Sequence, residues 1–376
     1  MNTALSTGRR AIVIYSPHAG RSAHLSHVLT VLCQAGVDVA DVLSITSVAN
    51  TLEQGSQWKA DGITMVVAAG GDGLVGGVTA SAISSDLPVG IMPLGTANDL
   101  ARSVGIPRKL AAAARVIASG TEQEIDIGLA RPIMQKLRAE LPDEKATAAA
   151  PPPLRQQCLF VHALTVGLSV QFARLATDKA IRQRYRRLTY PLALWKAFNA
   201  YRPVEAELHF EGVARRTTSS HVRSVTSEYA ILRGRIAQAT AVNAPIFWGP
   251  FEAAVPEVSF SDRLLDMVVF EDTSRHTLIQ RMLHFFSHAS HQIPRQNSWH
   301  ARYPSLLAAA LTDVPGVHHV QARSVTIFTE SEQQAVTLDG EVCSCTPIQA
   351  RVANERLRLI VPVSSLRRAH RVAWDG

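Results

Sequence analysis

Four consecutive residues, Gly70–Gly73, read Gly-Gly-Asp-Gly and follow directly on the apolar run Ile63–Ala69. Glycines permit positive φ angles and let backbone N–H groups approach a ligand closely. A buried strand that breaks into such a loop and then begins a helix predicts a phosphate-binding site. A carboxylate beside a phosphate repels it unless a cation such as Mg²⁺ lies between them. Asp72 therefore favours a metal-bound nucleotide over phosphate alone.

Two further polar loops follow apolar runs in the same way. Leu94–Asp99 follows the expected strand Pro88–Pro93, and Ser16–Arg21 follows the expected strand Ala11–Tyr15. Their candidate nucleotide-binding residues are Ser16, Gly20, Gly95, Thr96, Asn98 and Asp99. Because the carboxyl ends of parallel strands share one edge of a sheet, where open α/β sheets bind ligands, we expect the three loops to converge.

The glycine loop alone admits other interpretations. Gly71, Gly73 and Gly76 match the G-x-G-x-x-G fingerprint of dinucleotide-binding proteins. That fingerprint also requires an acidic residue about 20 positions later, at the end of the next strand, and neither Asp86 nor Asp99 lies in such a place. A Walker motif is excluded because no Gly-Lys-Ser/Thr follows. A plain strand–helix turn remains the simplest alternative.

The order of apolar patterns predicts two domains. Alternating strand-like and helical segments up to residue 128 predict an α/β domain with a parallel sheet, and many strand-like runs from residue 158 onward predict a mainly antiparallel β-sandwich. The stretch 129–157, which contains an alanine-rich segment and a proline triplet, is expected to be a linker or insertion. The predicted ranges are 1–128 for nucleotide binding, 158–350 for the second domain, and 351–376 for a strand and tail that return to the first domain.

Composition narrows the function classes. The chain has 376 residues, 47% of them hydrophobic, and a net charge of +7, which favours anionic partners. No apolar run reaches the roughly 18 residues that span a bilayer, and Ala11–Tyr15 is too short for a secretory signal. The four cysteines show no metal-site or disulfide spacing, so we expect a cytoplasmic protein.

With these motifs, the chain resembles the diacylglycerol kinase catalytic family, which includes bacterial lipid kinases and sphingosine kinases and is related to NAD kinases. The resemblance rests on five segments: Gly70–Gly73, Pro93–Arg102, Asp126–Gly128, Asp339–Glu341 and Thr346–Pro347. It implies a nucleotide-binding α/β domain, a β-sandwich that takes the lipid, and transfer of the γ-phosphoryl group of ATP to a hydroxyl of diacylglycerol or a similar lipid.

The resemblance also implies residue roles. Gly70, Gly71, Asp72 and Gly73 would bind the nucleotide phosphates. Asp339 would be the general base, with Glu341 assisting it or holding metal. Mg²⁺ would be held by Asp72, Asp262 and Asp266. By residue pattern alone, Asp339-Gly340 also predicts a hairpin turn after the strand Ala335–Leu338.

The chain departs from the family pattern at Leu74, Gly77 and Ser261–Arg263. These departures motivate the alternative of a catalytically impaired nucleotide-binding regulator, and phosphorylation of a dinucleotide cofactor is a third reading. The expected partner is a lipid at the inner membrane surface, and not nucleic acid. The basic cluster Arg182–Arg187 is either a solvated helix face or a surface that docks on an anionic membrane. A homodimer is left open.

Overall fold

The computed structural model describes most of the chain. The described residues are 8–16, 25–45, 57–95, 97–133, 158–177, 189–216, 223–225, 229–247, 253–255, 258–292, 314–330 and 332–363. The predicted ligand residues Gly20 and Thr96, the basic cluster Arg182–Arg187 and the segment 134–157 lie outside them.

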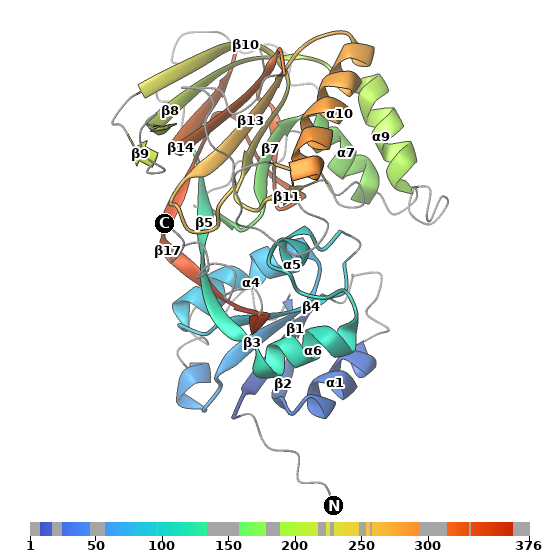
Figure 1. Cartoon of the computed structure of the whole chain (residues 1–376), viewed down its shortest axis with the longest axis vertical. Helices are drawn as coiled ribbons and strands as arrows, with labels where there is room; N and C mark the ends of the chain where they lie inside the picture. Colours follow the sequence, from blue (N-terminus) through green and yellow to red (C-terminus); the bar gives the residue numbers. More distant parts are fainter. Residues whose placement is uncertain are drawn as a thin grey trace, which may run out of the picture.

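The first part of the chain is a parallel sheet with helices, as predicted (Figure 1). The strands are β1 (Arg10–Tyr15), β2 (Asp38–Ser44), β3 (Met65–Gly70) and β4 (Val89–Pro93), in the order β4-β3-β1-β2. The helices are α1 (Leu25–Gln34), α4 (Asp72–Ser84), α5 (Asp99–Ser103) and α6 (Leu110–Ser119). Every residue of β3 and β4 is buried, as expected for central strands covered on both faces.

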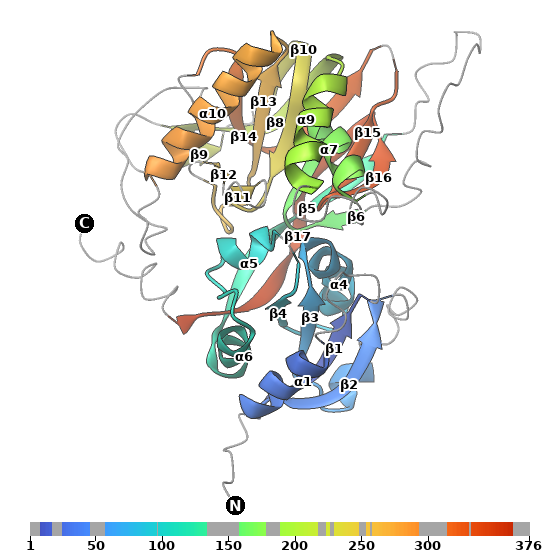
Figure 2. The ribbon, with the colours of Figure 1, turned by 90° about the vertical axis from the view of Figure 1, so that its right-hand side faces the viewer.

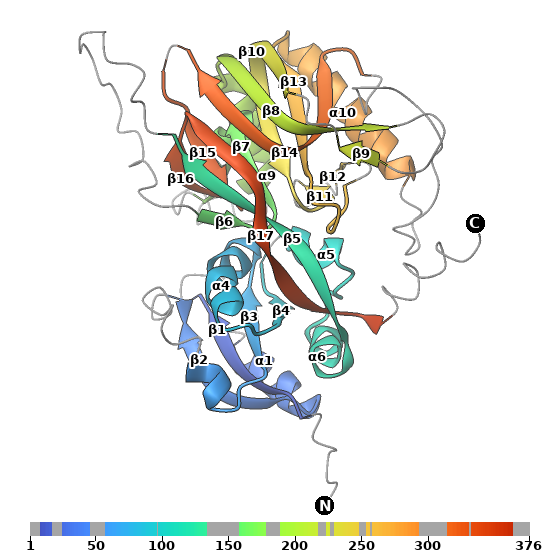
Figure 3. The same cartoon turned by 90° about the vertical axis from the view of Figure 1, so that its left-hand side faces the viewer.

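Two long strands join the two parts of the chain. β5 (Thr121–Pro132) pairs with β17 (Ile348–Val361) from Thr121↔Val361 to Ile348↔Pro132, and both run from one part into the other (Figure 3). β17 also pairs with β4 at Leu359↔Val89. The predicted boundary at residue 128 therefore falls inside a strand, and residues 129–132 of the expected linker belong to β5.

The second part is mainly antiparallel. Its strands are β6 (Cys158–Phe160), β7 (Ala163–Gly167), β8 (Val204–Arg216), β9 (Arg223–Val225), β10 (Tyr229–Val242), β11 (Ile246–Phe247), β12 (Ala253–Ala254), β13 (Leu265–Glu271), β14 (Val317–Thr329), β15 (Ala335–Leu338) and β16 (Glu341–Cys345). Its helices are α7 (Leu168–Thr177), α9 (Thr189–Ala200) and α10 (Arg275–Gln292).

The antiparallel strands do not form a detached sandwich. Their order, β16-β15-β7-β10-β13-β14, continues through β17 into the parallel strands, and β8 pairs with both β10 and β14. One apolar core, which includes Phe210, Leu265 and Ile327, lies among these strands. A second, with Val268, Leu278 and Phe285, lies between the sheet and the helices α7, α9 and α10 (Figure 2).

Two general features complete the fold. Within the described ranges, no helix combines the length and the apolar character needed to cross a membrane. All four cysteines are free thiols.

Candidate functional site

The ends of three parallel strands bring the predicted loops to one edge of the sheet. The register pairs Tyr15 with Ala69 and Gly70 with Pro93, so the residues that follow each strand are neighbours. Ser16, Gly71 and Leu94, the residues that follow the three strands, therefore lie beside one another at one edge of the sheet, where the strand order places them. The rest of the first loop lies outside the described residues.

The two glycine loops are in contact at their glycines. A β-carbon at Gly95 would lie 2.6 Å from the Cα atom of Gly71, and one at Gly71 would lie 3.2 Å from the Cα atom of Gly95. The Leu94 N–H also donates to the Gly70 carbonyl at 3.0 Å. Glycine is required here because two backbones approach more closely than side chains allow.

The carboxylate of Asp72 fastens the first loop to the second. Its two oxygens accept the backbone N–H groups of Asp99 (3.0 Å) and Leu100 (2.9 Å), which lie in the first turn of α5. Asn98 precedes this helix with φ 51°, and its side chain exchanges two hydrogen bonds with the Gly95 backbone. Asp72 therefore caps a helix on the neighbouring loop, a structural role that the sequence did not indicate.

This cap leads to a measurable expectation. Asp72→Asn keeps one acceptor oxygen and places an amide where the second N–H donates. We expect the free energy of unfolding to fall by about 1 kcal/mol, the usual value of a helix cap. Denaturant unfolding measures it, with the exposed Asp61→Asn as the control. An equal effect of the two substitutions would contradict the capping role.

The acidic hairpin lies directly against the glycine-rich helix α4. Asp339 (φ 49°) and Gly340 (φ 88°) form the turn between β15 and β16, as the Asp-Gly pair predicts. A β-carbon at Gly76 would lie 2.5 Å from Asp339 Oδ2, and one at Gly73 would lie 3.0 Å from Glu341 Oε1. Residues more than 260 positions apart in sequence thus share one site.

Three backbone amides hold the Asp339 carboxylate. Its Oδ2 accepts the N–H of Val161 (3.0 Å), and its Oδ1 accepts those of His162 (2.8 Å) and Ala163 (3.1 Å). Burial raises the pKa of this carboxyl above the ordinary value, although the His162 ring and the three amides act in the opposite direction. The carboxylate is therefore fixed in place and more basic than an exposed aspartate.

His162 belongs to the site and was missed by the sequence reasoning. Burial lowers the pKa of His162, but the carboxylates of Asp72, Asp99 and Asp339 raise it, and the net shift is upward. Its Nε2 lies 2.8 Å from the carbonyl oxygen of Ile246 in β11. A lone histidine inside an apolar segment carries no motif, so no sequence signal marks it. Val161 and His162 lie in the bend between β6 and β7.

The predicted metal ligands do not come together. Asp266 is fully buried in β13, where its Oδ1 lies 2.7 Å from His319 Nε2 and accepts the Gln321 amide at 2.8 Å. Asp262 Oδ1 accepts the Leu264 N–H at 3.2 Å. Among the described residues, no three His, Cys, Asp or Glu side chains are placed to hold a metal ion. Asp266 is thus engaged by His319 and Gln321, and the assignment of Mg²⁺ to Asp72, Asp262 and Asp266 stays a prediction.

Comparison with known proteins gives the same family as the motifs. Residues 10–130 match the family model of the diacylglycerol kinase catalytic domain. The predicted resemblance to this family is thereby confirmed.

Individual proteins are similar to this chain over different shares of its length. An uncharacterized protein of Synechocystis sp. is 24% identical over 310 residues, which are 82% of this chain and 57% of that protein. A diacylglycerol kinase of Bacillus subtilis is 32% identical over 126 residues, 32% of this chain and 41% of that enzyme. The chain thus spans about half the length of these relatives. The crystal structure of a putative diacylglycerol kinase from Bacillus anthracis has the same fold, with a TM-score of 0.62, 18% identity, and coverage of 96% of this chain and 98% of that one.

Proposed function

We propose that this chain is an ATP-dependent lipid kinase that transfers the γ-phosphoryl group to a hydroxyl of diacylglycerol or a related lipid. The observation that carries the proposal is the contact between the glycine-rich helix and the acidic hairpin, where Gly76 and Asp339 leave no room for a β-carbon. The backbone that would bind phosphate, at the start of α4, and the candidate base Asp339 therefore lie next to each other.

The loops supply the nucleotide side of the reaction. The N-terminus of the 13-residue helix α4 follows Gly71, and its free N–H groups and dipole suit the phosphates of ATP. Mg²⁺ would neutralise the phosphate charge, held by phosphate oxygens and the Asp72 carboxylate, because Mg²⁺ commonly uses one or two carboxylates beside a nucleotide. The charge of His162 would offset the negative charge of Asp72, Asp99 and Asp339.

Asp339 supplies the acceptor side. The lipid hydroxyl oxygen would bond to the γ-phosphorus as the bond to the bridging oxygen of ADP breaks, and the hydroxyl proton would pass to the Asp339 carboxylate. In phosphoryl transfer the protein mainly positions the groups and neutralises charge, so a base held by three amides suits this role. Glu341, whose Oε1 lies next to Gly73, would assist from the same hairpin.

The proposal is tested by label transfer. The full chain is incubated with Mg²⁺, lipid extract in mixed micelles, and ATP labelled at either the γ- or the α-phosphate. We expect labelled lipid from γ-labelled ATP and none from α-labelled ATP. Normal ATP binding without labelled lipid from any extract would contradict the proposal and favour a nucleotide-binding regulator. That alternative is supported by Leu74, whose buried apolar side chain packs against Gly70 where the family pattern has a hydroxyl.

The raised pKa of Asp339 predicts the pH dependence of turnover. Only the ionised carboxylate can accept a proton, so kcat is expected to fall as the pH is lowered through the pKa of Asp339. Because burial raises this pKa, the fall should begin at a higher pH than for an exposed aspartate, whose pKa is about 3.9. His162→Gln removes a cation that lowers the pKa of Asp339, and should move the acid limb to still higher pH. A kcat–pH profile of both proteins checks this, and a limb that moves to lower pH would contradict it.

The helical side of the second part would face the membrane. Trp195 of α9 and Leu283 of α10 are 64% and 66% exposed, and Arg275 hydrogen-bonds the two helices together through Asn199. Replacing both apolar side chains by serine should lower binding to anionic vesicles about tenfold, as expected for the lost apolar insertion. Ile231→Ser, at an exposed apolar residue of β10, is the control in a sedimentation assay. Equal effects would argue against docking by α9 and α10.

A further inference from the structure

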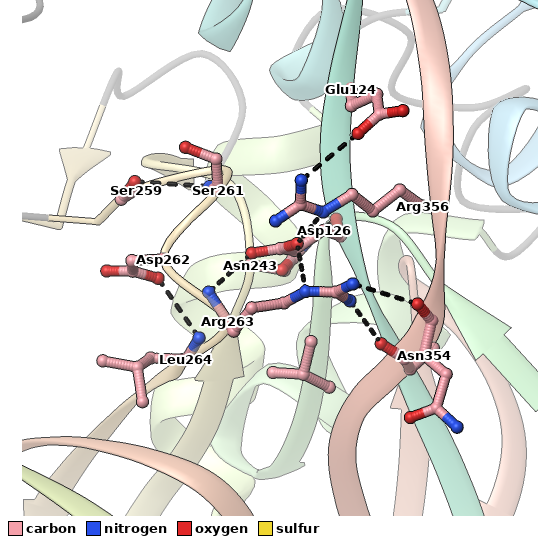
Figure 4. A network of polar contacts seen from close by, with 12 residues as sticks. Glu124, Asp126, Asn243, Ser259, Ser261, Asp262, Arg263, Leu264, Asn354 and Arg356 are labelled. Carbon is pink, nitrogen blue, oxygen red and sulfur yellow. Dashed lines mark hydrogen bonds and ion pairs between the residues drawn. The ribbon is translucent and has the colours of Figure 1, made fainter. Parts of the chain in front are cut away.

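A polar network occupies the crossing point between the two parts of the chain (Figure 4). At its centre is Asp126 of β5, whose side chain is 1% exposed. Its Oδ2 accepts the backbone N–H of Arg263 at 2.7 Å, and its Oδ1 accepts Nε of Arg356 at 3.0 Å and lies 3.5 Å from Nε of Arg263. A buried carboxylate is thus neutralised by two guanidinium groups.

The Arg263 guanidinium is surrounded by oxygen atoms. Besides Asp126, it donates to the carbonyl of Ala353 at 2.8 Å and to that of Asn354 at 3.0 Å, both in β17. A carboxylate together with backbone carbonyls is the oxygen set that a hard divalent cation takes. The family resemblance implied a metal ion at Ser261–Asp266, but Asp266 is buried beside His319 and does not reach this network.

The backbone of Arg263 has a conformation that is unusual for a residue with a side chain. Its φ is +62°, in the left-handed region that favours glycine. A side chain at such a φ strains the backbone, and the strain persists only where the surroundings compensate it. Here the compensation is the contact of the guanidinium with three oxygen atoms that belong to two different strands.

The network continues to the candidate active site. Asn243, which follows β10, donates its amide to the carbonyls of Asp126 (2.7 Å) and Val161 (2.9 Å). Its backbone N–H donates to the carbonyl of His162. Val161 and His162 in turn donate their N–H groups to Asp339. The crossing point and the candidate base therefore share one hydrogen-bonded turn.

We propose that the Arg263 guanidinium is a built-in cation that takes the place of a divalent metal ion between the two parts of the chain. The junction then needs no metal to hold β5, β17 and the loop before β13 together. Without the Arg263 guanidinium, the Asp126 carboxylate would keep the Arg356 guanidinium and the Arg263 backbone N–H. The vacated oxygen atoms of Asp126, Ala353 and Asn354 would then attract a cation. Because 41% of the Arg263 side chain is exposed, an ion from solvent could reach them.

The test measures thermal unfolding of the full chain without nucleotide, in EDTA and in millimolar Mg²⁺ or Ca²⁺. The wild-type Tm is expected to be the same in all three. Arg263→Gly removes the guanidinium and relieves the strained φ, and its Tm in EDTA should fall by about 5 °C, the size expected for loss of a partly buried ion pair in a chain of this length. Either divalent ion should restore at least half of that fall.

Two further variants make the result specific. Arg358→Ala removes an arginine of β17 that pairs with Glu122 and Asp86, away from the junction. The Tm of this variant should not change when Mg²⁺ or Ca²⁺ is added. Asp126→Asn in the Arg263→Gly background should abolish the metal response. A wild-type Tm that rises with metal as much as the variant's, or an Arg263→Gly variant that neither ion restores, would overturn the proposal. The test does not depend on kinase activity, so it stands apart from the proposed function.

Discussion

Asp339→Asn is expected to lower kcat for lipid phosphorylation by about 10³-fold and to leave ATP affinity nearly unchanged. The amide cannot accept the hydroxyl proton, and general-base catalysis contributes about 10²–10⁴-fold. A change in position adds to the loss of activity. In either orientation of the asparagine side chain, its NH₂ group would meet the backbone N–H of Val161 or His162, and two donors repel. Label transfer to lipid gives kcat, and calorimetry with ATP and Mg²⁺ gives the affinity.

Glu341→Gln is the matched control on the same hairpin. Glu341 is exposed, and it reaches Gly73 only through the end of a flexible side chain. We therefore expect kcat to fall by about tenfold or less. Thermal unfolding of both variants separates catalytic loss from misfolding. Turnover by a folded Asp339→Asn protein within about tenfold of wild type would remove Asp339 as the base.

The second prediction compares Gly76→Ala with Gly77→Ala. These two adjacent glycines of α4 differ in the space that a β-carbon would find. A β-carbon at Gly76 would lie 2.5 Å from Asp339 Oδ2, whereas one at Gly77 would lie 3.4 Å from Cδ1 of Ile45, an ordinary contact. Asp339 is held by three amides and cannot retreat freely. We expect Gly76→Ala to lower kcat about 10²-fold, the usual cost of displacing a reacting group by about 1 Å.

Gly77→Ala should keep full activity and raise the free energy of unfolding by up to about 1 kcal/mol, since alanine favours helix more than glycine does. The pair is measured by the same transfer assay and by denaturant unfolding. Equal kcat values for the two variants would contradict the placement of Asp339 against α4, whatever their stabilities.

Much of the site could be predicted from local patterns. The strand-to-glycine transitions at Gly70 and Gly95 and the Asp-Gly turn at Asp339 are short-range signals with a backbone cause, and the structure has each of them. Parallel strand order then dictates that the first loops share an edge. That the hairpin meets the loops followed from the family resemblance and not from any local pattern.

Residues that depend on distant contacts were not predictable in this way. Asp266 is only four positions from Asp262, yet β13 begins at Leu265 and strand alternation turns Asp266 with Val268 toward the helices. His162 gains its role from carboxylates on three other segments. β10 runs unbroken from Tyr229 to Val242 because pairing with β8 and β13 carries it through the polar interval at residues 233–235.

The central claim is that the nucleotide phosphates and the acidic hairpin meet at one point. A crystal structure of the full chain with Mg²⁺ and a non-hydrolysable ATP analogue tests it most directly. The account predicts that the terminal phosphate lies between the N-terminus of α4 and the Asp339 carboxylate, with Mg²⁺ on the side of Asp72. Phosphates bound away from Gly71 and Asp339, at any other part of the molecule, would contradict it.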